Sequence, residues 1–149
     1  MTTAQAEIGA RPVGVFPVSV DAQAVVAFAA ALGRTDPSDT KAPVPLTFPL
    51  RWFSDPAIRA ALVAASLPDA AGTQAMLPVH IEQRIALTEP LRIGAAYRLT
   101  TSVIGPDARN ILRVTATLSD DRGNPVGSLA SGFLLVSTDA GQPPATRHR

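Results

Sequence analysis

The sequence predicts a single α+β domain in which an antiparallel sheet packs against two helices. Two observations lead to this prediction. Apolar residues recur every three or four positions in the first half of the chain, at 22–32 and within 48–66, whereas they alternate with polar residues in the second half. Helices followed by closely spaced strands are typical of α+β domains, and 149 residues suit one such domain.

We expect this domain to span residues 13–137. Residues 1–12 have no apolar periodicity and are predicted to be a loose arm. Residues 138–149 are polar and contain two adjacent prolines, so they are predicted to be a disordered tail.

Composition excludes several classes of function. The net charge is +1, with 13 basic and 12 acidic residues, so a nucleic-acid partner is not expected. No apolar run approaches the ~20 residues of a membrane helix, and the N-terminus lacks a leader pattern, so we expect a cytoplasmic protein without a membrane partner. With no cysteine, two distant histidines and no nucleotide-binding motif, neither a metal site nor a cofactor is predicted.

The first predicted elements are an edge strand and a helix. Residues 13–20 are rich in valine, but Pro17 cannot donate to a central ladder. Asp21 is a good N-cap and Gly33 a good C-terminal stop, which predicts a helix over 22–32. Its apolar stripe is expected to pack on the sheet.

A proline-rich loop and a second helix follow. Residues 34–49 contain four prolines, which exclude a regular helix. In the next segment, 48–66, Ser54 or Asp55 is expected to cap an alanine-rich helix that has Pro56 in its first turn.

The segment 79–103 reads as two strands and a turn. Val79, Ile81, Ile85 and Leu87 alternate with polar residues and are interrupted only by Gln83. This alternation predicts one apolar face that grips the second helix and one polar face that carries His80 and Glu82 side by side. Pro90 and Gly94 mark the turn before the next strand, at 97–103.

Two more strands complete the predicted sheet. Residues 112–118 alternate apolar and polar side chains, which predicts a half-buried strand. Residues 126–136 are apolar at both parities, so we expect this strand to be the most central one. Gly127 and Gly132 are expected to permit a bend or a close approach.

Three segments together resemble the MaoC-like hydratase and dehydratase group of the hot-dog fold. They are Phe28-Ala-Ala-Ala-Leu-Gly33 with Asp36-Pro37, the run Ala42-Pro-Val-Pro-Leu-Thr-Phe48, and His80-Ile-Glu-Gln83 with Pro90-Leu-Arg-Ile-Gly94. The resemblance implies a curved antiparallel sheet wrapped around a central alanine-rich helix. It also implies acyl thioesters of CoA or of an acyl-carrier protein as substrates, and a homodimer or a heterodimer with another hot-dog subunit.

The catalytic pattern of that group is altered here. Active members of that group have a motif similar to Gly-Asp-x-Asn-Pro-x-His in the proline loop. This chain has Arg34 at the position of the aspartate and Asp39 at the position of the histidine. The resemblance therefore implies that the usual acid-base pair is missing. One reading is a non-catalytic subunit of a heteromeric hydratase.

Other residues could still carry acid-base chemistry. His80 could act as acid or base with Asp36 or Asp39, and Glu82 could help to bind substrate. The alternative is a solvated or interface histidine and aspartates that cap turns. If His80 has this acid-base role, the chain would be a stand-alone divergent enzyme, a thioesterase or a tailoring dehydratase. A non-enzymatic acyl-ligand binding module is the third possibility.

Candidate substrate-binding residues lie in the loop and at the start of the second helix. Arg34 and Lys41 could bind the phosphates of CoA or of a carrier arm, and they could equally be solvated loop charges. Trp52, the single tryptophan, could line an acyl tunnel or serve as a core anchor.

Overall fold

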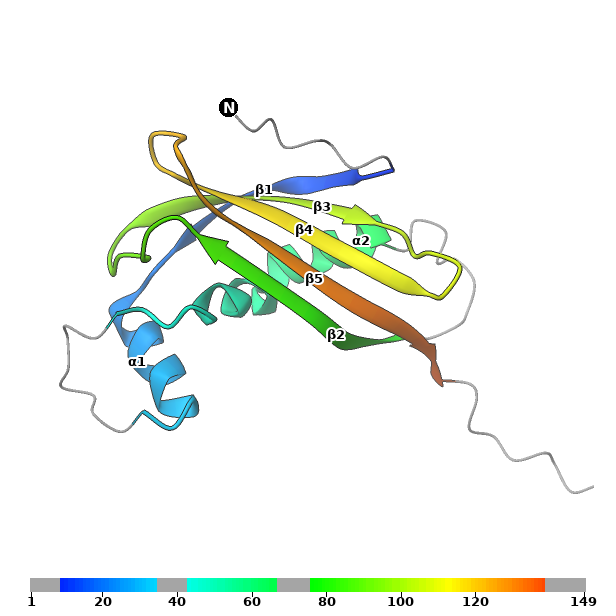
Figure 1. Cartoon of the computed structure of the whole chain (residues 1–149), viewed down its shortest axis with the longest axis horizontal. Helices are drawn as coiled ribbons and strands as arrows, with labels where there is room; N and C mark the ends of the chain where they lie inside the picture. Colours follow the sequence, from blue (N-terminus) through cyan, green and yellow to red (C-terminus); the bar gives the residue numbers. More distant parts are fainter. Residues whose placement is uncertain (1–8, 35–42, 67–75, 139–149) are drawn as a thin grey trace, which may run out of the picture.

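The computed structural model describes residues 9–34, 43–66 and 76–138 (Figure 1). The first half of the chain forms a strand, two α-helices and a 3-10 helix, and the second half forms four strands. In chain order these are β1 (Arg11–Ser19), α1 (Ala22–Ala31), η1 (Phe48–Ser54), α2 (Pro56–Ser66), β2 (Met76–Leu87), β3 (Ala96–Ile104), β4 (Ile111–Asp120) and β5 (Pro125–Ser137).

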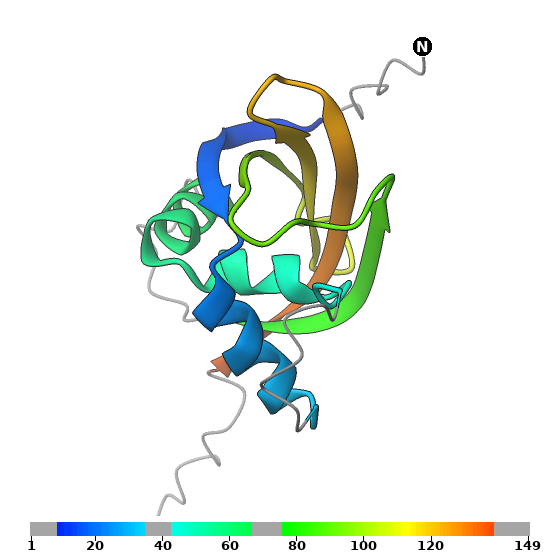
Figure 2. The same ribbon diagram turned by 90° about the vertical axis from the view of Figure 1, so that its left-hand side faces the viewer.

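The five strands form one antiparallel sheet in the order β1-β3-β4-β5-β2. The sheet curves, and η1 and α2 lie on its concave side (Figure 2). The predicted α+β class and the wrapping of a sheet around a helix are confirmed. The central strand is β4, so the prediction that 126–136 is the most central strand is wrong: β5 lies between β4 and the edge strand β2.

Both helices begin where the sequence predicts. The Asp21 carboxylate accepts a hydrogen bond from the Ala24 amide at 2.9 Å, which caps α1. The Asp55 carboxylate accepts from the amides of Ala57 and Ile58 at 2.9 and 3.2 Å, which caps α2. Gly33 has a φ of 80° after the last turn of α1, as a C-terminal stop requires.

The α1 helix lies beside η1 at one end of the sheet (Figure 1). The Phe28 ring meets the Phe48 ring edge-on, with the centroids 5.6 Å apart. Val25 is buried in the same core, whereas Leu32 is 54% exposed because the helix ends there. The apolar stripe thus packs chiefly through its first two turns, and it packs mainly beside η1 at the end of the sheet, not on the sheet as predicted.

The core fills the concave side of the sheet. Leu99, Ala116, Leu118 and Leu129 project from three neighbouring strands and pack with residues of η1 and α2.

The start of the domain differs from the prediction, because β1 begins at Arg11, inside the predicted arm. Within the described residues, no helix is long and apolar enough to cross a membrane.

Candidate functional site

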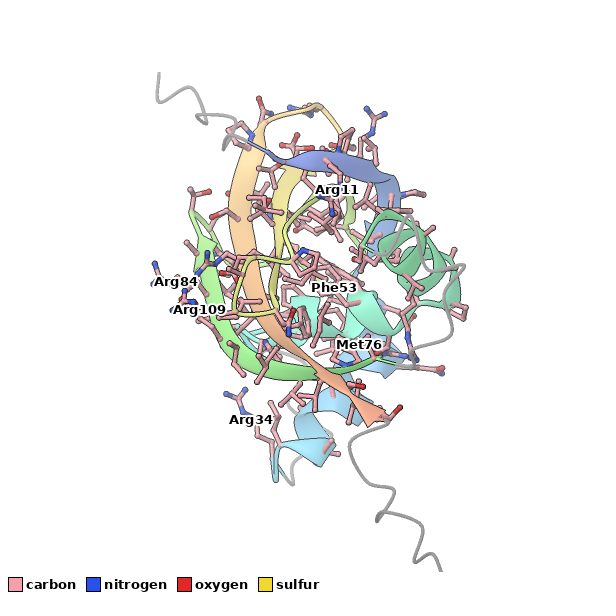
Figure 3. The ribbon with its side chains drawn as sticks, turned by 90° about the vertical axis from the view of Figure 1, so that its right-hand side faces the viewer. Arg11, Arg34, Phe53, Met76, Arg84 and Arg109 are labelled. Carbon is pink, nitrogen blue, oxygen red and sulfur yellow. The ribbon has the colours of Figure 1, made fainter. Side chains whose placement is uncertain are left out.

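A pocket of about 420 Å³ lies between the helices and the concave face of the sheet. We call it the concave pocket. Phe53 and Leu62 line it from the helices, and Leu112, Val114 and Phe133 line it from β4 and β5. Figure 3 shows Phe53 within the curve of the sheet. The walls are therefore mainly apolar, as in many sites for small organic ligands.

A β-bulge in β2 decides which side chains face this pocket. His80 pairs with Phe133 and Glu82 pairs with the next residue, Gly132, so Ile81 is an extra residue in the ladder. One extra residue reverses the inward and outward alternation beyond it. His80 therefore lines the concave pocket, and Gln83 resumes the inward positions after the bulge.

The predicted faces of this strand are consequently wrong in their first half. Val79 and Ile81 are 40% and 51% exposed and do not grip the helix. Glu82 lies on the convex face, where its carboxylate pairs with the Arg84 guanidinium at 2.9 Å. Figure 3 shows Arg84 on the outside of the sheet. His80 and Glu82, predicted as neighbours on one polar face, are thus on opposite faces.

His80 is held by two contacts at the edge of the pocket. Its Nε2 atom lies 2.9 Å from the backbone oxygen of Glu82. Its ring stacks on the Phe133 ring, with the centroids 5.0 Å apart and the planes 25° apart. Because a carbonyl oxygen only accepts, Nε2 carries the proton in this bond, and a neutral His80 has its acceptor lone pair on Nδ1.

A polar pair that sequence reasoning missed lies next to His80. The hydroxyl of the buried Ser131 donates to the side-chain oxygen of Gln83 at 2.6 Å. The Gln83 amide nitrogen donates to the backbone oxygen of Arg84 at 3.1 Å. The signal in the sequence was Gln83 itself, the one polar residue among apolar positions of its strand. A polar residue at such a position is expected to have a buried partner.

The helix wall contributes a second buried hydroxyl. Ser66, in the last turn of α2, donates to the backbone oxygen of Leu62 at 2.6 Å and lines the same pocket. Arg59, one helical turn earlier than Leu62, is exposed and is the charged residue of the lining. The pocket thus combines an apolar body with a small number of polar groups on both walls.

Comparison with known proteins defines the fold. No family model matches the sequence, and no curated protein sequence matches it. Among solved structures, a truncated HadBC (3R-hydroxyacyl-ACP dehydratase) complex from Mycobacterium tuberculosis superposes with a TM-score of 0.57 at 16% identity, covering 83% of this chain and 96% of that one. The (R)-hydratase of A. caviae gives 0.56 at 15% identity over 87% and 98% of the two chains. A putative thioesterase of Prochlorococcus marinus gives 0.56 at 14% identity over 91% and 85%.

This chain has the hot-dog fold. The hot-dog architecture predicted from its short motifs is therefore confirmed, with α2 as the helix inside the curved sheet. At these identities the likeness shows the fold alone.

Two of the remaining predicted site residues of this hot-dog domain, Trp52 and Arg34, do not line the concave pocket. Trp52 is buried in the core outside the concave pocket, and its Nε1 donates to the backbone oxygen of Ser19 at 3.1 Å. Arg34 is exposed just after α1. Asp36, Asp39 and Lys41 lie outside the described residues. The proposed pairing of His80 with a loop aspartate therefore stays a prediction.

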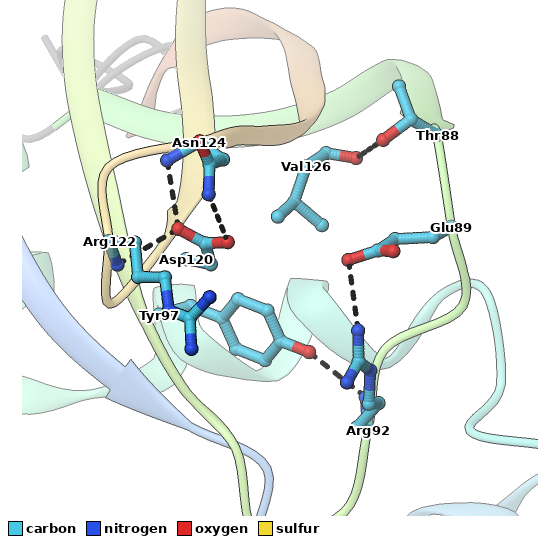
Figure 4. A network of polar contacts seen from close by, with 8 residues as sticks. All are labelled: Thr88, Glu89, Arg92, Tyr97, Asp120, Arg122, Asn124 and Val126. Carbon is cyan, nitrogen blue, oxygen red and sulfur yellow. Dashed lines mark hydrogen bonds and ion pairs between the residues drawn. The ribbon is translucent and has the colours of Figure 1, made fainter.

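A second polar cluster of the hot-dog domain lies at the turns where the strands end (Figure 4). The Arg92 amide donates to the Tyr97 hydroxyl at 3.0 Å, and the Thr88 hydroxyl donates to the backbone oxygen of Val126 at 2.8 Å. These bonds close the loop between β2 and β3 onto its neighbours.

Among the described residues, no three His, Cys, Asp or Glu side chains come together in a way that could hold a metal ion.

Proposed function

We propose that this protein is a MaoC-like hot-dog protein that takes part in the hydration or dehydration of enoyl or 3-hydroxyacyl thioesters of CoA or a carrier protein. The observation that carries the proposal is the concave pocket, an apolar cavity of about 420 Å³ with His80 and Ser131 on its sheet wall. An acyl chain suits the apolar body, and the thioester end suits the polar groups. The hydratase and dehydratase among the similar structures support this chemistry.

In the first version the chain is the non-catalytic subunit of a heteromeric hydratase. Arg34 and Asp39 replace the acid and base that the family motif would place in the proline loop. The similar mycobacterial structure is itself a HadBC complex, which supports a second subunit as partner. A partner subunit would then supply the aspartate and the histidine, while this chain supplies the interface and part of the acyl pocket.

The edge of β2 is the surface that we propose for this partner or, in a homodimer, for a second copy of this chain. Among the described strands β2 ends the sheet, and its outward residues Leu77, Val79 and Ile81 are exposed. A second hot-dog strand running antiparallel beside it would extend the sheet. In a homodimer centred on Gln83, Glu82 of each copy would lie opposite Arg84 of the other, which pairs opposite charges.

Mixing tests this version. The isolated chain is expected to hydrate no enoyl thioester, measured by the loss of the enoyl absorbance, because it lacks the acid-base pair. Addition of a cognate hot-dog subunit that carries the aspartate and the histidine is expected to restore turnover above that of either protein alone. Strong hydratase activity of the isolated chain would exclude the non-catalytic role.

A second version, a stand-alone enzyme, is favoured by the position of His80. Its Nε2 is engaged by the Glu82 carbonyl, so that Nδ1 is the atom available to act as base, with a loop aspartate as its partner. The matching reactions are those of a tailoring dehydratase or a thioesterase. His80→Ala is then expected to lower turnover by about 100-fold or more, the scale for loss of a general acid or base.

The control for this experiment is the only other histidine of the chain, replaced in His148→Ala. An unchanged rate in a folded His80→Ala protein would remove the stand-alone version. Saturable binding of acyl thioesters without turnover, both alone and with candidate partners, would instead point to an acyl-ligand binding module.

A further inference from the structure

Three polar groups of the concave pocket have already committed their hydrogens elsewhere. Ser131 donates its hydroxyl hydrogen to Gln83 at 2.6 Å, and Ser66 donates its own to the Leu62 carbonyl at 2.6 Å. His80 directs Nε2 to the Glu82 carbonyl at 2.9 Å. A hydroxyl group has only one hydrogen, so both serine oxygens can only accept from a ligand. The same holds for Nδ1 of a neutral His80.

The orientation of Gln83 follows from its two contacts. Its amide nitrogen faces the backbone oxygen of Arg84, which can only accept. The reversed orientation would place the side-chain oxygen against that carbonyl and would leave both without a hydrogen. The Gln83 oxygen therefore faces Ser131, and the Ser131 hydrogen lies between the two oxygens. The Ser131 oxygen then presents lone pairs, not a hydrogen, to its remaining surroundings.

Burial makes this polarity matter for ligand choice. Ser131 and Ser66 are 5% and 6% exposed, so bulk water has little access to their oxygens and does not replace a missing ligand contact. A ligand hydroxyl can donate to such an oxygen and gains a hydrogen bond. A ligand carbonyl at the same place brings two acceptors together, unless a serine gives up its 2.6 Å bond. An unsubstituted chain leaves the serine oxygen without a donor.

We infer that the concave pocket selects acyl groups that carry a hydroxyl, with Ser131 on the sheet and Ser66 on α2 as the accepting residues. The inference rests on the proposed function and narrows it: of the thioesters in a hydration and dehydration pair, the hydroxylated one is the species that this chain holds. The corresponding oxoacyl and unsubstituted acyl groups are expected to bind more weakly. Sites built to hydrogen-bond a substrate hydroxyl discriminate strongly against analogues that lack it.

The test compares three ligands that differ at one position only. The ligands are amide analogues of 3-hydroxybutyryl-, 3-oxobutyryl- and butyryl-pantetheine. In each, nitrogen replaces the thioester sulfur, so that the ligand resists hydrolysis. Their Kd values for the full-length chain are measured by calorimetry. The hydroxyl analogue is expected to bind about tenfold or more tightly than each of the others, the scale of one hydrogen bond to a buried group.

Variants assign the preference to its residues. Ser131→Ala is expected to remove most of the tenfold preference, and Ser66→Ala is expected to reduce it. The matched control is Ser128→Ala, a serine on the same strand that is exposed on the opposite face. If Ser131→Ala does not fold, Ser66→Ala and the three-ligand comparison in the unaltered protein still decide the question.

Each other outcome has a distinct meaning. Equal Kd values for the three amides, or tighter binding of the oxo analogue, would overturn the inference while leaving the proposed function intact. A hydroxyl preference that survives both serine variants would overturn the assignment to these residues. Failure of every amide to bind would remove the proposed function, and the inference with it.

Discussion

Adjacent side chains on one strand of this protein have opposite environments. Thr100 of β3 is exposed on the convex face, while Thr101 is 1% exposed on the concave side, between Gly14 and Ala116. The Thr101 hydroxyl has no hydrogen-bond partner among the described residues. A buried hydroxyl without a partner costs free energy of folding, because it has lost its bonds to water.

Replacing Thr101 by valine is therefore expected to stabilise the protein. Valine keeps the branched shape of threonine and removes only the polar atom, so Thr101→Val should raise the free energy of unfolding by about 1 kcal/mol. Urea denaturation measures the change. Thr100→Val is the matched control and should alter stability by less than about 0.5 kcal/mol. A destabilised Thr101→Val protein would show that the hydroxyl is hydrogen-bonded in solution.

Two turns of the sheet are organised by aspartates at corresponding positions. In the β3–β4 turn, hydrogen bonds from the backbone amides of Ile111 and Arg109, at 3.0 and 2.8 Å, lower the pKa of Asp107 below its ordinary value of 3.8. In the β4–β5 turn, the side chain and then the backbone amide of Asn124 do the same for the pKa of Asp120. Both turns thus depend on an ionised carboxylate.

A lowered pKa in the folded state sets the direction of the pH effect. The stabilisation is complete above 3.8, the value in the unfolded chain, and is lost as the pH falls through the lower folded values. When the pH is lowered from 3.8, the urea concentration at the unfolding midpoint should therefore decrease. The decrease should be larger for the unaltered protein than for the Asp107→Asn, Asp120→Asn double variant. Asp121→Asn serves as control and should follow the unaltered protein. Parallel pH curves for all three proteins would refute this account.

The C-terminus of α2 is tied to the sheet by one arginine. Arg11 of β1 donates from Nε and Nη2 to the backbone oxygen of Ala65, at 3.4 and 3.3 Å, and from Nη2 to that of Gly105 at 2.6 Å. The last carbonyls of a helix have no partner within the helix, and a cation near them also complements the helix dipole. Arg11 thus joins β1, α2 and the turn after β3.

Loss of this side chain should destabilise the domain. Arg11→Ala leaves the Ala65 and Gly105 carbonyls without these donors and is expected to lower the free energy of unfolding by about 1–2 kcal/mol. Chemical denaturation measures the loss, and hydrogen exchange should locate it in the last turn of α2. Arg98→Ala, an exposed arginine on β3, is the control. Equal effects of the two substitutions would mean that the three contacts contribute nothing specific.

At the scale of the whole molecule, an apolar patch lies exposed on the convex face of the sheet beside one of its edges. Leu77, Val79 and Ile81 of β2 and Val136 of β5 are 40–55% exposed. They adjoin the edge of β2 that pairs with no other strand in the part of the chain that the structure describes, so a second strand could pair there. A patch of this kind next to an open strand edge is typical of a protein interface.

If a second copy of this chain docks along β2, charges on the patch should prevent it. The double variant Val79→Lys, Ile81→Lys is expected to lower the molar mass in solution from dimer to monomer, measured by light scattering, with the thermal midpoint of the monomer fold retained. Val15→Lys is the matched control, because Val15 is 60% exposed on the opposite edge strand. A dimer that persists in the double variant, or dissociates in the control, would place the interface elsewhere.

Local sequence signals were sufficient for most elements of this fold. The caps at Asp21 and Asp55, the stop at Gly33 and the alternation in β3 and β4 all act within a few residues of one another. Such signals depend on backbone conformation and on which face of a strand is buried, both of which a linear pattern records. The order of the short motifs was enough to predict the hot-dog architecture.

The faces of β2 could not be predicted, because they depend on its pairing with β5. Ile81 is an extra residue only because His80 pairs with Phe133 and Glu82 pairs with the adjacent Gly132. Close packing at Gly127 has the same origin: a Cβ there would lie 2.5 Å from the backbone oxygen of Ala86. Neither relation exists in the sequence of one strand.

The sequence alone determined most elements, their caps, the hot-dog architecture and the difference at Arg34 and Asp39 from the motif of the group that the chain resembles, since each depends on residues close together in the chain. The tertiary structure decided that β4 is the central strand, that Glu82 leaves the site and that Gln83, Ser131 and Ser66 enter it. The physical reason is register: hydrogen bonding between strands distant in the sequence selects which side chains face the pocket, and one bulged residue is enough to exchange them.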